Sequence, residues 1–205
     1  MDNIKDLLRI GKQSIKDKMA LDKGGNISIR KKNYMLIKAS GVRLDKANKN
    51  DYVKVFFENG KDEKKKASSE KFMHMQCYQK RKDINAVVHL HSVCATALAN
   101  SKLKVGNINY EVIACLGSDL IRASYRPSAS KALAEQIGKY IKKSNGILLS
   151  NHGILTVGRN LKQAYMRALA VERAAAVILF SKLLSKTSFL PKKEASRIIS
   201  IYKDK

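Results

Sequence analysis

Several features that define common protein classes are missing from this sequence of 205 residues. No stretch approaches the roughly 20 consecutive apolar residues that a membrane-spanning helix needs, so we expect no membrane segment. The N-terminus has no charged region followed by an apolar one, and we therefore expect no secretory signal. The cysteines, Cys77, Cys94 and Cys115, are far apart and form no Cys-x-x-Cys pair. This favours reduced thiols in a cytoplasmic protein over a disulfide framework or a cysteine-only zinc site.

Acidic side chains are scarce: 17 stand against 41 lysines and arginines, which gives a net charge of +24. Such a charge attracts polyanions, and nucleic acid is the first candidate. The basic residues are scattered in short runs, however, and aromatic side chains do not alternate with them as a base-stacking surface requires. We therefore favour a lysine-rich solvated surface over a nucleic-acid interface. Its field would still attract a small phosphorylated substrate.

Hydrophobic residues make up 44% of the chain, enough for a sizeable core, and we find no internal repeat or linker. We therefore expect a single domain over residues 1–205. Periodicity predicts helices over residues 3–20, 68–80, 92–100, 128–143, 160–184 and 191–202. It predicts strands over residues 26–30, 34–38, 51–56, 86–91, 110–114, 146–150 and 154–157. Short hairpins mixed with helices indicate an α/β or α+β layer fold, with a largely antiparallel sheet and helices on its faces.

The segment around His89 and His91 carries the strongest chemical signal. In a strand, alternate side chains point to the same face, so both imidazoles should lie together. Two imidazoles on one strand end can occupy two positions of one zinc ion. The alternative is an edge strand with two solvated histidines.

Two further residues extend this interpretation. His152 follows a predicted buried strand and precedes a glycine, so it can supply a third imidazole and complete the ligand set of an open catalytic zinc site. Glu70, at the start of a predicted helix capped by Ser68 or Ser69, is our candidate for the proton-transfer carboxylate. The alternative for Glu70 is a favourable interaction with the helix dipole. We interpret His74, one turn further on, as a packing or orienting residue.

Small and polar residues recur at three predicted turns. Backbone amides, hydroxyls and a side-chain amide that can be approached closely are suited to hold a phosphate group. The candidates are Gly25, Asn26, Ser40, Gly41, Ser68 and Ser69. Any one of these turns is weak evidence, because glycine and serine are common in turns.

Taken together, these segments resemble the class II aldolase/adducin family, and within it the bacterial and archaeal L-fuculose-phosphate aldolases. The resemblance covers roughly residues 5–185 and follows five motifs in their family order. They are Gly24-Gly25-Asn26-Ile27-Ser28, Ala39-Ser40-Gly41, Ser68-Ser69-Glu70 with His74, Val87-Val88-His89-Leu90-His91-Ser92, and Asn151-His152-Gly153.

This resemblance implies a three-layer αβα fold and a homotetramer with active sites between subunits. It implies Zn2+ bound by His89, His91 and His152, with Glu70 as acid/base and the turn residues around the phosphate of dihydroxyacetone phosphate. Tyr110 matches a tyrosine that serves a neighbouring subunit's site as proton donor, and Tyr202 is the candidate for a C-terminal tyrosine that assists. Ser128 stands where fuculose-type enzymes have an aromatic residue that helps to bind the aldehyde, so the aldehyde is left open.

Other activities remain open as well. Methylthioribulose-1-phosphate dehydratases share the histidines and the glutamate, whereas ribulose-phosphate 4-epimerases usually carry aspartate in place of Glu70. Decarboxylases of sugar-acid phosphates are a further alternative. Adducin-like binding proteins lack the histidine triad, which argues against a metal-free binding role, and salt-dependent DNA or RNA binding would support a nucleic-acid binder.

Overall fold

The computed structural model describes residues 2–202, and these residues form one seven-stranded sheet in the order β3-β2-β1-β4-β7-β6-β5. Neighbouring strands are antiparallel except for the parallel pair β5 and β6. The strands are β1 (Asn26–Arg30), β2 (Tyr34–Lys38), β3 (Tyr52–Phe56), β4 (Ala86–Leu90), β5 (Ile121–Ala123), β6 (Gly146–Leu149) and β7 (Gly153–Gly158). The prediction of a mostly antiparallel sheet is therefore confirmed.

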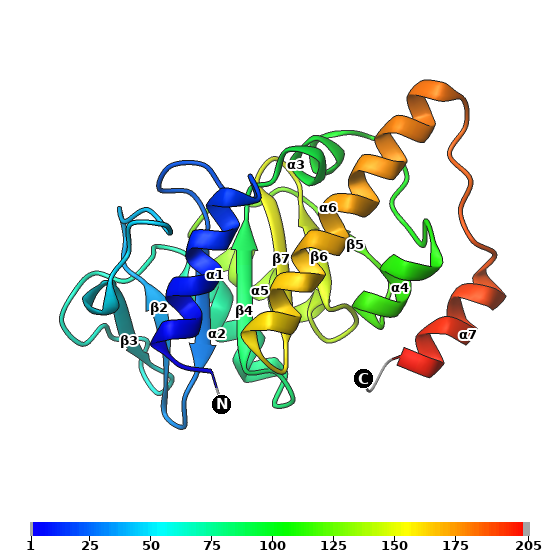
Figure 1. Ribbon diagram of the computed structural model, residues 1–205. Coiled ribbons are helices and arrows are strands. Elements are labelled where there is room, and N and C mark those ends of the chain that lie inside the picture. Colours follow the sequence, from blue (N-terminus) through cyan, green and yellow to red (C-terminus); the bar gives the residue numbers. More distant parts are fainter. Residues whose placement is uncertain (1, 203–205) are drawn as a thin grey trace.

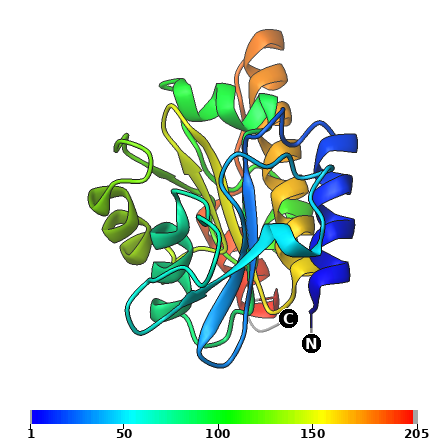
Figure 2. The same cartoon turned by 90° about the vertical axis from the view of Figure 1, so that its left-hand side faces the viewer.

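Helices cover both faces of this sheet (Figures 1 and 2). On one face α6 packs against β4 and β7 and contacts α1, α3 and α4, while α2 and α5 pack together on the other face. The helix α7 packs against α4. The helices are α1 (Ile4–Lys16), α2 (Lys71–Lys80), α3 (Val93–Asn100), α4 (Tyr110–Leu116), α5 (Lys131–Tyr140), α6 (Leu161–Leu184) and α7 (Lys192–Tyr202), with a short 3-10 helix η1 (Lys49–Asp51).

Each face of the sheet has its own hydrophobic core, and β4 shows how the sequence divides between them. Val88 and Leu90 belong to the core under α1, α3 and α6, whereas Val87 belongs to the core under α2 and α5. Because side chains alternate along a strand, His89 shares the second face with Val87. His89, the first candidate ligand, therefore lies on the face of the sheet that α2 and α5 cover.

Two local predictions are wrong, and the sequence analysis misses one strand. The segment from Tyr110 to Ala114 is part of helix α4, because the Asn109 side chain caps it and Gly117 ends it in a left-handed conformation. Helix α2 begins later than predicted, with Glu70 as the N-cap. The side chain of Glu70 makes no capping bond, but the Ser68 hydroxyl accepts a hydrogen bond from the Glu70 amide at 3.3 Å. The short strand β5 was not predicted at all. The remaining predicted elements are present, with ends shifted by a few residues.

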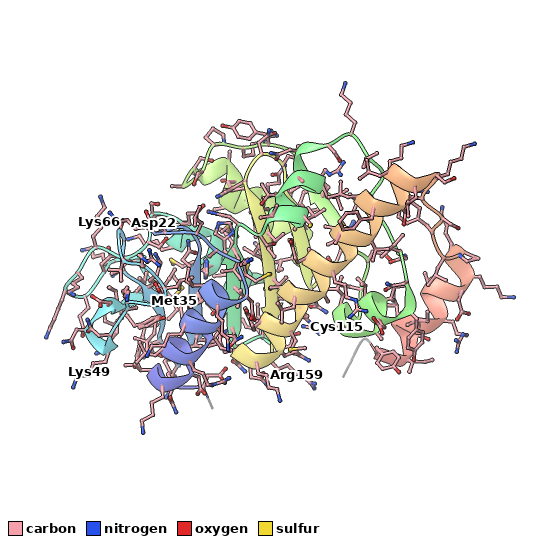
Figure 3. All side chains as sticks on the ribbon, turned by 45° about the horizontal axis from the view of Figure 1, so that its top comes forward. Asp22, Met35, Lys49, Lys66, Cys115 and Arg159 are labelled. Carbon is pink, nitrogen blue, oxygen red and sulfur yellow. The ribbon has the colours of Figure 1, made fainter. Side chains whose placement is uncertain are left out.

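The basic surface and the cysteines agree with the composition. Nitrogen-tipped side chains project outward on several sides of the molecule, as near the labelled Lys49, Lys66 and Arg159 in Figure 3. All three cysteines are free thiols. Within residues 2–202, no helix combines the length and the apolar character required to cross a bilayer.

Candidate metal centre

The site is built at the end of β4, at the top of the sheet in Figure 1, where the chain enters α3. His89 is fully buried, and its Nδ1 donates a hydrogen bond to the Ile154 carbonyl of the neighbouring strand β7 at 2.7 Å. This bond fixes the ring and leaves Nε2 free to face the site. His91 follows the strand, and its Nε2 lies 2.9 Å from the Nε2 of His89. The predicted pairing of the two imidazoles is thus present in the structure.

The third imidazole comes from the tight connection between β6 and β7. Leu149 and Gly153 pair across this hairpin, and Asn151 takes a left-handed conformation with φ 57°. The backbone amide of His152 donates to the Leu149 carbonyl at 3.0 Å, which closes the turn. Because β7 pairs with β4, the turn delivers the His152 ring to the other histidines, with its centroid 4.7 Å from that of His89 and 5.1 Å from that of His91.

Gly153 permits this close approach. A Cβ atom at position 153 would lie 2.6 Å from Cδ2 of His91 and would collide with the Leu90 carbonyl oxygen. Any side chain there would force apart the end of β4 and the start of β7. The close packing around His91 therefore requires a glycine after His152.

Glu70 faces the histidines from the N-cap of α2. Its loop is held to β2, because the Ser68 amide donates to the Lys38 carbonyl at 3.0 Å. Glu70 is only 6% exposed. Its Oε2 lies 3.1 Å from Nε2 of His89, and its Oε1 lies 3.0 Å from Nε2 of His152.

Both oxygens of Glu70 have an additional donor. Asn26, which pairs with His89 across β1 and β4, donates from Nδ2 to Oε2 at 2.8 Å. Ser128 donates from Oγ to Oε1 at 2.9 Å. The carboxylate is therefore held by donors from two segments far from it in the sequence.

The electrostatics of the cluster favour a bound cation. Burial opposes ionisation of Glu70, but the charge of His89 and the hydrogen bonds from His152 and His89 hold the pKa of the carboxyl well below its usual range. Burial and the charges of His89 and His152 lower the pKa of His91 to about 3, so its ring is neutral. Neutral imidazole nitrogens and a carboxylate are all acceptors, so a metal ion can take the place of the proton and charge that His89 brings to this cluster.

The donor set fits a divalent metal ion. One ligand atom from each of Glu70, His89, His91 and His152 can be chosen so that all four lie within 4.8 Å of one another. Ligands of a tetrahedral zinc ion bound at about 2.0–2.1 Å lie about 3.3 Å apart, close to the separations seen here. The hydrogen bond from His89 to Ile154 is also the kind of supporting contact that metal-ligating histidines make.

The predicted phosphate-binding residues come from turns on the Asn26 side of Glu70. Gly25 has φ 73° and precedes Asn26 directly, and a Cβ there would press on the backbone of His89. The turns around Ser40 and Ser68 are joined, because the Ser40 amide donates to the Lys66 carbonyl at 3.0 Å and Ala39 pairs with Ala67. Gly41 and Ser69 are exposed beside them.

Lys38 is a residue near this site that the sequence analysis missed. It is 2% exposed, and its ammonium group donates to the Lys23 carbonyl at 3.0 Å and to the Val42 carbonyl, which lie in the two flanking turns. Burial lowers its pKa to about 8, against the opposing effect of Glu70 and Asp22. The available signal was a lysine at the end of an otherwise apolar strand.

Two predicted residues lie outside the cluster. His74 is fully buried, and its Nδ1 lies 2.7 Å from the Ser28 hydroxyl, which agrees with a packing or orienting role. Tyr110 is 48% exposed, and its hydroxyl lies 2.7 Å from that of Tyr202. These two tyrosines lie on α4 and α7, at a distance from the end of β4 (Figure 1).

Comparison with known proteins gives a consistent result. Residues 5–179 match the family model described as "Class II Aldolase and Adducin N-terminal domain". The chain is 36% identical over 160 residues to an L-fuculose phosphate aldolase of Methanococcus maripaludis, covering 77% of this chain and 86% of that protein. It is 30% identical over 196 residues to a 5-deoxy-D-ribulose 1-phosphate aldolase of Bacillus thuringiensis, covering 94% and 92%.

Solved structures show the same fold. An L-fuculose 1-phosphate aldolase superimposes with a TM-score of 0.91 at 30% identity, covering 99% of this chain and 98% of that one. An L-fuculose-1-phosphate aldolase from Thermus thermophilus superimposes with a TM-score of 0.81 at 23% identity, covering 91% and 97%. The predicted three-layer fold is thereby confirmed.

Proposed function

Because the chain belongs to the family of class II aldolase and adducin N-terminal domains, we propose that it is a zinc-dependent aldolase. Its substrate would be a ketose 1-phosphate of the L-fuculose 1-phosphate kind, cleaved to dihydroxyacetone phosphate and an aldehyde. Curated relatives with this activity in their names support the substrate class. The observation that carries the proposal is the convergence of three imidazoles and one carboxylate from three separate segments.

The donor chemistry supports zinc as the metal. His89, His91 and His152 would hold the ion, since three imidazoles that leave one position open are typical of catalytic zinc sites. When bound, the metal supplies Lewis acidity that polarises the ketose carbonyl and stabilises the negative charge that develops as the carbon–carbon bond breaks.

The residues of the chain account for binding and proton transfer. The turns at Gly25–Asn26, Ser40–Gly41 and Ser68–Ser69 offer amides and hydroxyls to the phosphate group. In the cleavage, the hydroxyl of the carbon that becomes the aldehyde passes its proton to a base, which is the group that donates a proton to the aldehyde oxygen in the reverse condensation. The electrons of the broken bond move toward the former carbonyl. The carbon left behind must then gain a proton. Glu70, buried beside the cluster, is placed to hold and deliver it.

We further propose that the chain assembles as a homotetramer in which Tyr110, with Tyr202, serves the site of a neighbouring subunit as proton donor. The exposure of Tyr110 and its position away from the metal cluster of its own chain support this arrangement. The hydrogen bond to Tyr202 also raises the pKa of Tyr110, so its hydroxyl keeps its proton at neutral pH.

Elemental analysis combined with product analysis tests the proposed function. We expect about one zinc ion per chain in the purified protein. We also expect formation of dihydroxyacetone phosphate from fuculose 1-phosphate. Methylthioribulose 1-phosphate serves as the competing substrate, because a dehydratase releases no dihydroxyacetone phosphate from it. Glu70→Gln should lower kcat by about 10²–10⁴-fold.

Two histidine variants provide matched controls. His91→Ala removes a ligand and should abolish both bound zinc and turnover, whereas His74→Gln changes a buried histidine outside the cluster and should retain the metal. Zinc retained by His91→Ala, or dehydration of methylthioribulose 1-phosphate without aldol cleavage of fuculose 1-phosphate, would contradict the proposal.

A further inference from the structure

Polar side chains join β1 to α2 in two neighbouring pairs. Asn26 of β1 donates to Glu70 at the start of α2 at 2.8 Å, and the Ser28 hydroxyl lies 2.7 Å from Nδ1 of His74. Asn26 and Ser28 lie on one face of the strand, about 7 Å apart, because side chains alternate along it. Glu70 and His74 are four residues apart, which corresponds to about 6 Å along a helix. The two spacings are similar, so both pairs form at once.

A third contact continues this series in the same direction. Tyr78, one turn after His74, places its hydroxyl 2.8 Å from that of Ser28. Arg30, two residues after Ser28, donates to the Tyr78 carbonyl, and its guanidinium lies 4.9 Å from the centre of the Tyr78 ring. Because a shift of α2 by one residue would turn its side chains by about 100°, only one position of α2 along β1 makes all of these contacts.

Apolar packing defines this position less sharply. The buried apolar side chains of α2 include Met73 and Met75, which are unbranched and adapt to different surroundings. The hydrophobic effect is also non-directional. A hydrogen bond has a preferred geometry, and Ser28 and His74 are both 0% exposed. Among residues 2–202, Nε2 of His74 is buried without a partner, so the bond to Ser28 alone orients this ring.

We propose that Ser28 is a positioning residue for Glu70. By holding His74, its hydroxyl fixes where α2 lies along β1, and the N-cap of α2 carries the carboxylate that lies 3.0 Å from His152. Ser28 is not one of the four candidate ligands and acts on the site through Glu70. This inference rests on the proposed function, because that function places Glu70 beside the metal and gives it a part in proton transfer.

Zinc affinity tests this role without reference to the substrate. We expect Ser28→Ala to bind zinc roughly tenfold more weakly in a chelator competition, because a carboxylate that is no longer held adds less to the site. The same change in a Glu70→Gln background should alter the affinity by less than about twofold, since the group through which Ser28 acts is already lost. A merely structural role would lower the affinity equally in both backgrounds.

Kinetics on fuculose 1-phosphate provide a second readout. Ser28→Ala should lower kcat by roughly tenfold, because Glu70 is displaced from the position at which it transfers the proton. KM should stay within about twofold of the wild-type value, since the turns assigned to the phosphate group are unchanged. In the Glu70→Gln background, Ser28→Ala should have little further effect on kcat.

Ser14→Ala is the matched control. Ser14 is also 0% exposed and donates to the Ile10 carbonyl at 2.8 Å, but both residues belong to α1. Its loss should lower the unfolding temperature as Ser28→Ala does, and should leave zinc affinity and kcat unchanged. Should Ser28→Ala not fold, Ser28→Cys replaces it, because a thiol has a similar size but forms only weak hydrogen bonds.

The outcomes separate this inference from the proposed function. Wild-type zinc affinity or wild-type kcat in Ser28→Ala would overturn the role of Ser28 while the proposed function stands, and so would equal losses with and without Glu70. If the wild type binds zinc but does not cleave fuculose 1-phosphate, the proposed function fails and zinc affinity still decides the role of Ser28. A wild type that binds no zinc contradicts both.

Discussion

Hydrogen-bond partners separate the histidines of this chain into two groups. The Nδ1 of His89 is bonded to a backbone carbonyl, so its Nε2 faces His91 and Glu70 in the cluster. His74 is equally buried, but it lies beside the Ser28 hydroxyl, which also contacts Tyr78. The same residue type is therefore a candidate ligand in one network and a structural residue in the other.

The buried His74 makes stability depend on pH. Burial and the charge of His89 lower its pKa to about 3, whereas an unfolded histidine titrates near 6.5. Below pH 6.5 the unfolded chain binds a proton that the folded chain does not, so the free energy of unfolding falls as the pH falls. For this one group the loss is about 2 kcal/mol between pH 7 and pH 5. In His74→Gln, urea unfolding of the metal-free protein should therefore depend less steeply on pH.

Tyr78→Phe is the matched control for this measurement. It removes the other partner of the Ser28 hydroxyl but no group that titrates near neutral pH, so it should keep the pH dependence of the wild type. An unchanged pH dependence in His74→Gln would show that His74 is not buried in its neutral form.

The contact between α3 and α6 holds the chain directly after His91. Ser92 is the N-cap of α3 but makes no side-chain capping bond. Glu172 of α6 takes this role, because its two oxygens accept hydrogen bonds from the amides of Cys94 at 2.9 Å and Ala95 at 2.7 Å. A carboxylate at a helix N-terminus also interacts favourably with the helix dipole. One helix thus caps another at the point where the chain leaves the candidate metal centre.

Glu172→Ala should lower the free energy of unfolding by about 2 kcal/mol, because two partly buried amides lose a charged acceptor. Urea denaturation measures the loss, and a chelator competition should show weaker zinc binding, since the segment after His91 is released. The neighbouring variant Arg173→Ala is the control, because it breaks only a surface pair with Glu111 at 3.5 Å and should cost less than about 0.5 kcal/mol. Equal losses in the two variants would contradict the capping role.

The residues of the candidate cluster come from three separate segments of the chain. Its ligands come from the N-cap of α2, the end of β4 and the connection between β6 and β7. A metal ion bound there joins these segments only in the folded state, and therefore stabilises the fold. The molecule has a net charge of +24, yet a carboxylate and three imidazoles lie close together at this end of the sheet.

Removal of the metal should therefore lower the unfolding temperature. Binding at about 1,000 times the dissociation constant contributes about 4 kcal/mol. For a chain of this size that corresponds to roughly 10 °C. Differential scanning fluorimetry with a chelator, followed by addition of zinc, measures the shift and its recovery. A shift that persists in His91→Ala would place the metal elsewhere.

Local sequence signals predicted most elements and failed where two signals competed. The apolar alternation of residues 26–30, 34–38 and 86–91 correctly predicted strands, and Asn160 caps α6 as expected. The segment Tyr110 to Ala114 is rich in residues that favour strands, yet the capping residues Asn109 and Gly117 prevail and α4 packs against α6 and α7. The three-residue strand β5 is too short to show periodicity.

The sequence by itself determined which types of side chain are available to the site. These are two histidines two residues apart on a strand, a third histidine before a glycine, and an acidic residue ahead of a helix. Only the tertiary structure decided that Asn26, Lys38 and Ser128 lie close to the same carboxylate or its flanking turns. The physical reason is that separation along the chain does not specify which strands pair or in which register. The pairing of β4 with β1 and β7 fixes how far these side chains lie from the carboxylate of Glu70. This pairing forms because it buries the apolar side chains on both faces of the whole sheet.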